Sequence, residues 1–443
     1  MERATPMDMP APASTLAGDG DAALFAKVAR RLLPFLFVCY LIAQVDRMNV
    51  GFAKLTMLKD LGFSELVYGI GAGTFFIGYV LFEVPSNIAL RKFGAPMWLG
   101  RIMITWGLLS IAMLFVRTPA SFYILRFLIG VAEAGFFPGV IFYLTLWFPA
   151  ARRTRMTAIF MTAIAVAGVV VGPVSGLILE TLHDFGGLPG WQWLFIIEGT
   201  PAVLLGIACM KRLDAGPASA LWLTPAERDR LAAIVAQDGP AAGPATGHAP
   251  LSSVMTNGRV LALSLVYGCY GTSFFGFVFW LPTIIQSAGI ASPLMIGVLS
   301  TIPWLVGAAT MLTLASRVSS LRNVGPLLIA LALVSAFGWA VSPAALVSMP
   351  LAMLCCSLAM AGTMGSLPVF WNLPTAMFTG TAAAAAIALI SALGNIPGFL
   401  SPYLVGWIKT ATGAFDIPMY VFAATMLLAA IVLSFLTRAP AHD

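Results

Sequence analysis

Charged side chains are scarce in this chain of 443 residues, at 9% of the total against 60% hydrophobic residues. Soluble globular domains carry about 25% charged residues, so this chain has too few to cover a water-facing surface. The shortage excludes a soluble enzyme, a nucleic-acid-binding protein and a secreted scaffold, and it favours lipid as the solvent. The net charge of +6 does not indicate nucleic-acid binding, because the positions of charges matter more than their sum.

The chain also lacks the residue patterns that hold metals, disulfides or nucleotides. Its three histidines fall in loops or at the C-terminus, where they cannot assemble a haem or zinc site. It has no Cys-x-x-Cys pair and no G-x-x-x-x-G-K-[ST] loop for ATP. We therefore expect no metal and no bound cofactor, and we interpret the cysteines as small buried apolar residues: Cys39, Cys209, Cys269, Cys355 and Cys356.

Long apolar segments make up most of what remains, and each is near or above the roughly 20 residues that a helix needs to cross a bilayer. One long polar stretch, residues 211–259, separates the sixth segment from the seventh. Within it, Thr224, Pro225 and Glu227 predict the start of a short amphipathic helix, followed by a flexible linker. The twelve segments lie near residues 31–52, 64–88, 96–116, 120–147, 157–180, 191–210, 260–286, 291–314, 323–342, 345–367, 381–403 and 417–437.

This layout predicts an all-α membrane protein with twelve transmembrane helices in two pseudo-symmetric six-helix halves, as in many secondary transporters. Lys and Arg concentrate on the side of the N-terminus; the other side carries only Lys54, Lys59, Arg117 and Lys409. Positive residues favour the cytoplasmic side, so both termini are predicted to be cytoplasmic. The expected divisions are a disordered tail (1–25), an N-terminal half (26–210), a cytoplasmic linker (211–259), a C-terminal half (260–438) and a short tail (439–443).

Charged residues inside the spans are informative, because each costs about 2.5–3.5 kcal/mol to insert. Counting 1.5 Å per residue, Asp46 of span one and Glu133 of span four could share one level, and Gly130 leaves their surroundings open. With Arg47 and Arg126 they sum to zero charge. Two interpretations remain: a polar pocket, in which arginines bind an anion and carboxylates carry protons, or a structural ion-pair network. No acidic residue occurs between Asp238 and Asp416, so a proton-carrying carboxylate must belong to the first half.

Two further carboxylates and several second-half residues are weaker candidates. Glu83, with Arg91 as its expected partner, and Glu198 are candidates for gating. In the second half, aromatic and hydrogen-bonding side chains are candidates for contacting the substrate, although such a stripe is also typical of packing. These are Tyr267, Tyr270, Phe274, Trp371, Asn372, Ser391 and Asn395.

Several motifs in order resemble the major facilitator superfamily, and within it the anion:cation symporter branch that includes tartrate, phthalate and 4-hydroxyphenylacetate permeases of bacteria. They are Val45–Asn49, Phe82–Asn87, Arg126–Gly139, Trp147–Pro149, Trp193–Gly199, Phe279–Pro282 and Pro368–Trp371.

The resemblance implies proton-coupled import of an organic carboxylate by alternating access, in a monomer of the bacterial inner membrane. Residue by residue, Asp46 and Glu133 match the protonatable positions, and Arg47 and Arg126 match the anion-contacting positions. Tyr79 matches a tyrosine on the pocket face of span two. Protons are then the only coupling ion expected.

Some positions depart from the family pattern. The loop after span two lacks the usual Asp, an apolar run replaces a Gln in span five, and Ser391 stands where relatives carry an Asn. The last two changes favour a small or aromatic carboxylate over a sugar acid. The glycines of Gly168–Gly176 resemble the motif of antiporters, although close helix packing is the favoured explanation for them. A proton antiporter or exporter therefore stays open as an alternative, whereas no nucleophile–base pair supports a membrane-embedded enzyme.

Overall fold

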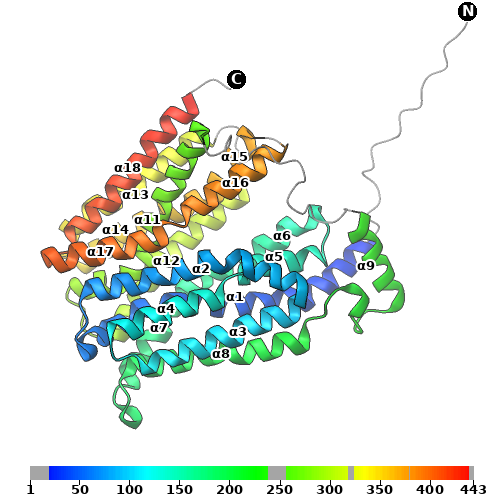
Figure 1. Ribbon diagram of the computed structural model, residues 1–443. Coiled ribbons are helices and arrows are strands. Elements are labelled where there is room, and N and C mark those ends of the chain that lie inside the picture. The colour runs from blue at the N-terminus through cyan, green and yellow to red at the C-terminus, as the bar shows by residue number, and fades with distance from the viewer. Residues whose placement is uncertain (1–18, 238–255, 318–323, 379, 439–443) are drawn as a thin grey trace, which may run out of the picture.

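The computed structural model describes residues 19–237, 256–317, 324–378 and 380–438. Within these ranges the chain is helical and has no strand. Twelve helices, some of them broken, are long and apolar enough to cross a membrane. The predicted fold class is confirmed: the first half and the second half form two groups of helices lying side by side (Figure 1).

The helices of the first half are α1 (Asp19–Leu61), α2 (Glu65–Phe93), α3 (Ala95–Ala112), α4 (Pro119–Glu133), α5 (Phe136–Thr145), α6 (Ala150–Met161), α7 (Ala163–Thr181) and α8 (Gly190–Arg212). The linker contributes α9 (Pro225–Gln237). Those of the second half are α11 (Gly258–Ser287), α12 (Pro293–Arg317), α13 (Gly325–Ala345), α14 (Met349–Phe370), α15 (Asn372–Met377), α16 (Gly380–Gly394), α17 (Pro397–Thr412) and α18 (Asp416–Arg438).

Four of the spans are broken into two helices each, and the break in the fourth span has a clear local cause. Helix α4 ends at Glu133, and Gly135 then adopts a left-handed conformation with φ of 86° before α5 begins. Glycine adopts this conformation without the steric cost that a Cβ would bring. The break therefore leaves the Glu133 carboxylate at the end of a helix in the middle of a span.

Small residues bring the two halves into close contact along two helix pairs. A Cβ on Gly172 of α7 would lie 2.4 Å from the carbonyl oxygen of Gly297 on α12, and one on Gly69 of α2 would lie 2.4 Å from that of Pro402 on α17. The glycines of span five thus serve packing between the halves, as expected where small residues let backbones approach.

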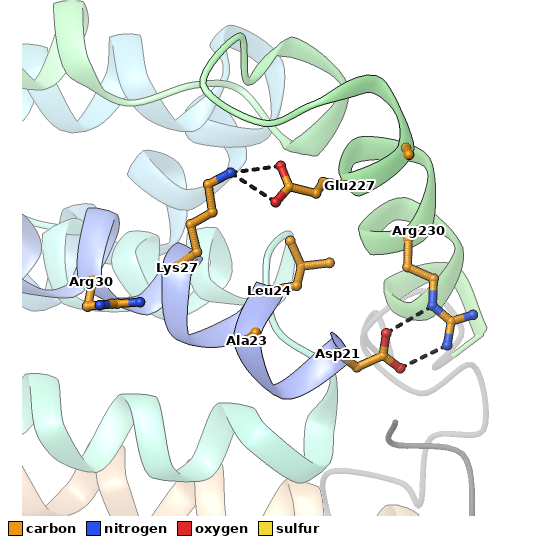
Figure 2. A pocket seen from close by; sticks show the side chains of 8 residues that line it. Asp21, Ala23, Leu24, Lys27, Arg30, Glu227 and Arg230 are labelled. Atoms are coloured by element: carbon orange, nitrogen blue, oxygen red, sulfur yellow. Dashed lines mark hydrogen bonds and ion pairs between the residues drawn. The ribbon is translucent and has the colours of Figure 1, made fainter. Parts of the chain in front are cut away.

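The linker helix α9 packs against the first turns of α1 (Figure 2). Lys27 Nζ lies 2.8 Å from Glu227 Oε2, and the Arg230 guanidinium donates to both carboxylate oxygens of Asp21 at 3.0 and 2.8 Å. Helix α1 consequently starts at Asp19, earlier than the predicted boundary at residue 25, because α9 supplies partners for its first turns. The remainder of the expected tail, residues 1–18, lies outside the described residues.

Candidate functional site

Glu133 and Arg47 form an ion pair between α4 and α1. Glu133 is buried at the helix break, whereas the Arg47 side chain is 19% exposed. The Arg47 guanidinium also lies over the rings of Phe75 and Tyr79 on α2, 5.2 and 5.3 Å from their centroids. Tyr79, expected on the pocket face of span two, thus makes a cation–π contact with Arg47.

Asp46 points in a different direction, toward α3. Its carboxylate accepts hydrogen bonds from Trp106 Nε1 at 2.6 Å, Ser110 Oγ at 2.9 Å and Asn49 Nδ2 at 3.1 Å. No arginine lies within ion-pair distance of it in the described part of the chain. Consecutive residues on a helix point about 100° apart, so Asp46 and Arg47 meet different neighbours and the expected four-residue cluster is divided.

Arg126 is the second buried arginine, and it is 1% exposed. Its guanidinium lies 3.4 and 3.5 Å from the carbonyl oxygens of Gly71 and Ala72 on α2, and 5.1 Å from the centroid of the Phe75 ring. Among the described residues no carboxylate lies within 4.0 Å of it. Arg126 is thus a buried cation whose partners are neutral.

Gly130 explains how α4 comes so close to α2. A Cβ on Gly130 would lie 2.0 Å from the carbonyl oxygen of Phe75, so only glycine fits there. The expectation that Gly130 leaves open space is wrong, because the position is filled by the backbone of α2. This close approach is what places Arg126 against the carbonyl oxygens of α2.

The expected pairing of Glu83 with Arg91 does not occur among the described residues. Glu83 is half-buried on α2 and forms no ion pair there, while Arg91 lies over the ring of Phe142, 5.7 Å from its centroid. Eight residues separate the two, more than two helical turns and about 12 Å along the axis, which is too far for direct contact.

In the second half, Tyr267 is the centre of an aromatic group. Its ring lies 5.2 Å from that of Phe370 and 5.0 Å from that of Trp371, measured between centroids. Gly394, at the end of α16, packs against the Tyr267 ring, where a Cβ would clash at 2.0 Å. Tyr267 is half-buried, and its neighbours come from α14 and α16, so three elements of the second half meet there.

Some of the other second-half candidates pack against neighbouring side chains or bond to their own helix, and others are half-buried. Tyr270 is fully buried edge-on to Phe370, and Phe274 packs edge-on to Trp304 at 6.1 Å. The Asn372 amide donates to the carbonyl oxygens of Pro368 and Val369 one turn back, so it needs no partner on another helix. Two candidates are half-buried near the break between α16 and α17: Ser391 and Asn395.

The model of one family, described as the Major Facilitator Superfamily, matches residues 36–402 of the sequence. The chain belongs to this superfamily. It is a multi-pass membrane transporter, since that is what the family match and the twelve spans together show.

Curated relatives within the superfamily match almost the whole chain. A protein of Agrobacterium vitis named "Putative tartrate transporter" is 43% identical over 95% of this chain and 96% of its own length. This match agrees with the anion-transporting branch. A protein of Acinetobacter baumannii named "Quinolone resistance transporter" is 40% identical over 93% of this chain and 94% of its own. Each name describes that relative only.

Solved structures of the superfamily share the fold at low sequence identity. The xylose transporter XylE of E. coli, in a partially occluded inward-open conformation, aligns with a TM-score of 0.70 over 94% of this chain and 99% of its own. Its sequence identity of 16% makes this a likeness of fold alone.

The chain also contains a group of interacting charged residues that was not predicted from the sequence. Lys54, assigned to an outer loop from the sequence, instead lies on α1 and is 3% exposed. Its Nζ is 2.7 Å from Glu65 Oε2 on α2, 2.8 Å from Thr283 Oγ1 on α11 and 3.6 Å from the Trp280 ring centroid. Glu65 Oε1 in turn lies 2.6 Å from Lys409 Nζ on α17.

We call the group formed by Lys54, Glu65, Thr283 and Lys409 the latch, because it joins both halves. The latch lies where α1 ends and α2 begins, and we call this the tied end. Glu180 of α7 also joins the two halves at this end, because its carboxylate accepts a hydrogen bond from the backbone N–H of Leu294 on α12 at 3.1 Å. The only available sequence signal was that the apolar pattern of span one continues past Lys54 without a turn residue.

Proposed function

We propose that the chain is a proton-coupled symporter that imports an organic anion, a small or aromatic carboxylate, by alternating access. Protons are the only coupling ion in this proposal, and the working unit is a monomer in the bacterial inner membrane. The bias of Lys and Arg supports cytoplasmic termini, which would make the tied end the outward-facing one.

Arg126 is the observation that carries the proposal. A buried guanidinium cannot lose its proton, and without a neutralising anion its burial is costly. In the described structure it contacts carbonyl oxygens and an aromatic face, and no carboxylate lies within ion-pair distance of it. A carboxylate substrate would supply the missing charge through two parallel N–H···O bonds, the geometry that arginine favours.

The Arg47–Glu133 pair supports coupling between protons and substrate. A proton that adds to the Glu133 carboxylate turns it into a neutral acid and ends its attraction to Arg47. The Arg47 guanidinium, whose Nε–H has no acceptor among the described residues, is then free to bind a substrate carboxylate. Loss of that proton restores the ion pair and displaces the substrate. Asp46 is the second carboxylate that we assign to proton coupling.

Uptake into proteoliposomes with an alkaline interior tests the proposal. The panel is labelled tartrate, phthalate, 4-hydroxyphenylacetate and a sugar acid. We expect gradient-driven accumulation of at least one, and its loss in both Asp46→Asn and Glu133→Gln. Glu227→Gln, which removes a carboxylate outside the spans, is the matched control. Accumulation that survives in both variants would overturn the assignment.

The relative named for quinolone resistance favours one alternative, a proton antiporter that exports its substrate. The same vesicles distinguish the two directions. Accumulation only when the interior is acidic would favour the antiporter.

A further inference from the structure

Glu198 is a buried carboxylate that the Arg47–Glu133 pair does not involve. It lies on α8 and is 4% exposed. Its Oε1 accepts a hydrogen bond from Ser175 Oγ on α7 at 2.7 Å, and its Oε2 has no partner among the described residues. An ionised carboxylate with one hydroxyl partner and no cation is costly at this depth, whereas a protonated one is not.

A second buried oxygen next to Glu198 also lacks a donor. Asn49 lies within hydrogen-bonding reach of Glu198. It donates an amide N–H to Asp46 Oδ1, and its own Oδ1 has no partner among the described residues. A protonated carboxylic acid has one O–H donor, whereas an ionised carboxylate has none. A proton on Glu198 would therefore provide a donor where two acceptors are left unsatisfied.

In the part of the chain that the structure describes, no charged group serves as a counter-ion to Glu198. On α1 the nearest acid is Asp46, and the cations Arg47 and Lys54 are bonded to Glu133 and Glu65. The neighbours on helix α3, Ser110 and Trp106, are uncharged. Ser110 lies next to Gly199, since a Cβ built on Gly199 would be 3.2 Å from the Ser110 Cβ. Helix α7 presents the Ser175 hydroxyl; its carboxylate Glu180 is bonded at the tied end.

Helix α7 connects Glu198 to the contact between the halves. Ser175 lies one turn beyond Gly172, which packs on Gly297, and beside Gly176, where a Cβ would lie 2.5 Å from the carbonyl oxygen of Pro293. The helix that donates to Glu198 is thus also a helix that contacts the second half.

We propose that Glu198 is a third proton-coupling carboxylate, which holds a proton in this state and releases it to water in another. In that step the carboxyl O–H bond breaks, the electron pair stays on Glu198, and water takes the proton. The carboxylate regains a proton from the opposite side of the membrane. The inference rests on the proposed proton coupling and adds one proton per cycle.

Infrared spectroscopy of the purified protein at neutral pH tests the resting state without any substrate. We expect the wild-type minus Glu198→Gln spectrum to contain the C=O stretch of a protonated carboxyl group. A difference that contains only ionised carboxylate bands would overturn the proposal. If size-exclusion chromatography shows that Glu198→Gln folds poorly, Glu198→Asp is used instead. The C=O stretch of the protonated carboxyl group should then shift between the wild type and Glu198→Asp. An unshifted C=O stretch would overturn the proposal.

The proton count provides the second test, with labelled tartrate as the probe. Each proton carried contributes a factor of about ten to the limiting accumulation ratio at a gradient of one pH unit. We expect Glu198→Gln to lower that ratio about tenfold and Glu227→Gln to leave it unchanged. A wild-type ratio in Glu198→Gln would refute the inference alone. Absence of gradient-driven uptake of the whole carboxylate panel by the wild type would refute the proposed function, while the infrared result still stands.

Discussion

Neutralising Glu65 should release the tied end. Glu65→Gln keeps the size of the side chain and removes the charge that balances Lys54, which is 3% exposed. Removing one partner of a buried ion pair costs about 3–5 kcal/mol. Glu65 is 24% exposed, so solvent screening reduces this to about 1–3 kcal/mol.

The cost applies to the state in which the halves are joined, because separation of the halves lets water reach Lys54. The equilibrium between joined and separated tied ends should therefore shift by about 5–150-fold toward separation. A transporter held in the separated state would bind substrate from that side and turn over slowly.

Distances between spin labels across the tied end measure this shift. The exposed residues Lys59 on α1 and Ala411 on α17 are suitable label sites as cysteines, because the five native cysteines are buried. We expect Glu65→Gln to enlarge the long-distance population, with Glu227→Gln as the control. An unchanged distance distribution in Glu65→Gln would show that the latch does not hold the halves together.

Three further predictions concern other contacts. Arg126→Lys should raise the KM for the transported carboxylate about tenfold or more, because the two-pronged contact is lost. Gly172→Leu should destabilise the protein by about 1–3 kcal/mol, since a Cβ would lie 2.4 Å from the carbonyl oxygen of Gly297; the melting temperature in detergent measures this. The Lys27 ammonium holds the pKa of the Glu227 carboxyl below its usual range. Their pair therefore stabilises the docking of α9 above the unfolded pKa of about 4.3 and is lost as the pH falls through the folded value. Hydrogen exchange in α9 should rise on such acidification.

The fold was predictable from the sequence because lipid imposes one strong constraint. Each span must be apolar for about 20 residues and must satisfy its own backbone, so composition alone locates the helices. The residues at which the helices begin and end were less predictable. Helix α1 runs from Asp19 to Leu61, well beyond the predicted 31–52, because α9 and the latch supply partners for polar residues at its two ends.

The charged residues of the site were predictable, but their pairing was not. Insertion cost singles out Asp46, Arg47, Arg126 and Glu133. Which of them meet depends on the rotation of each helix about its axis and on the break after Glu133, and sequence spacing does not determine either. Lys54 was missed for a related reason: only the packed structure shows Glu65 and Thr283 converging on it.

The two halves offer an internal comparison that bears on Asp46. In the first half, Trp106 of α3 donates its indole N–H to Asp46 of α1 at 2.6 Å. In the second half, Trp339 of α13, the third span there, donates to Ser273 of α11, the first span, at 2.7 Å.

A neutral hydroxyl is therefore sufficient for this contact between the first and third spans of a half. The carboxylate of Asp46 costs about 2.5–3.5 kcal/mol more to insert, so packing does not account for its charge. We expect Asp46→Ser, which copies the second half, to fold with a melting temperature close to the wild type and to lose gradient-driven accumulation. A variant that unfolds would instead assign Asp46 to structure, and one that still accumulates substrate would remove it from proton coupling.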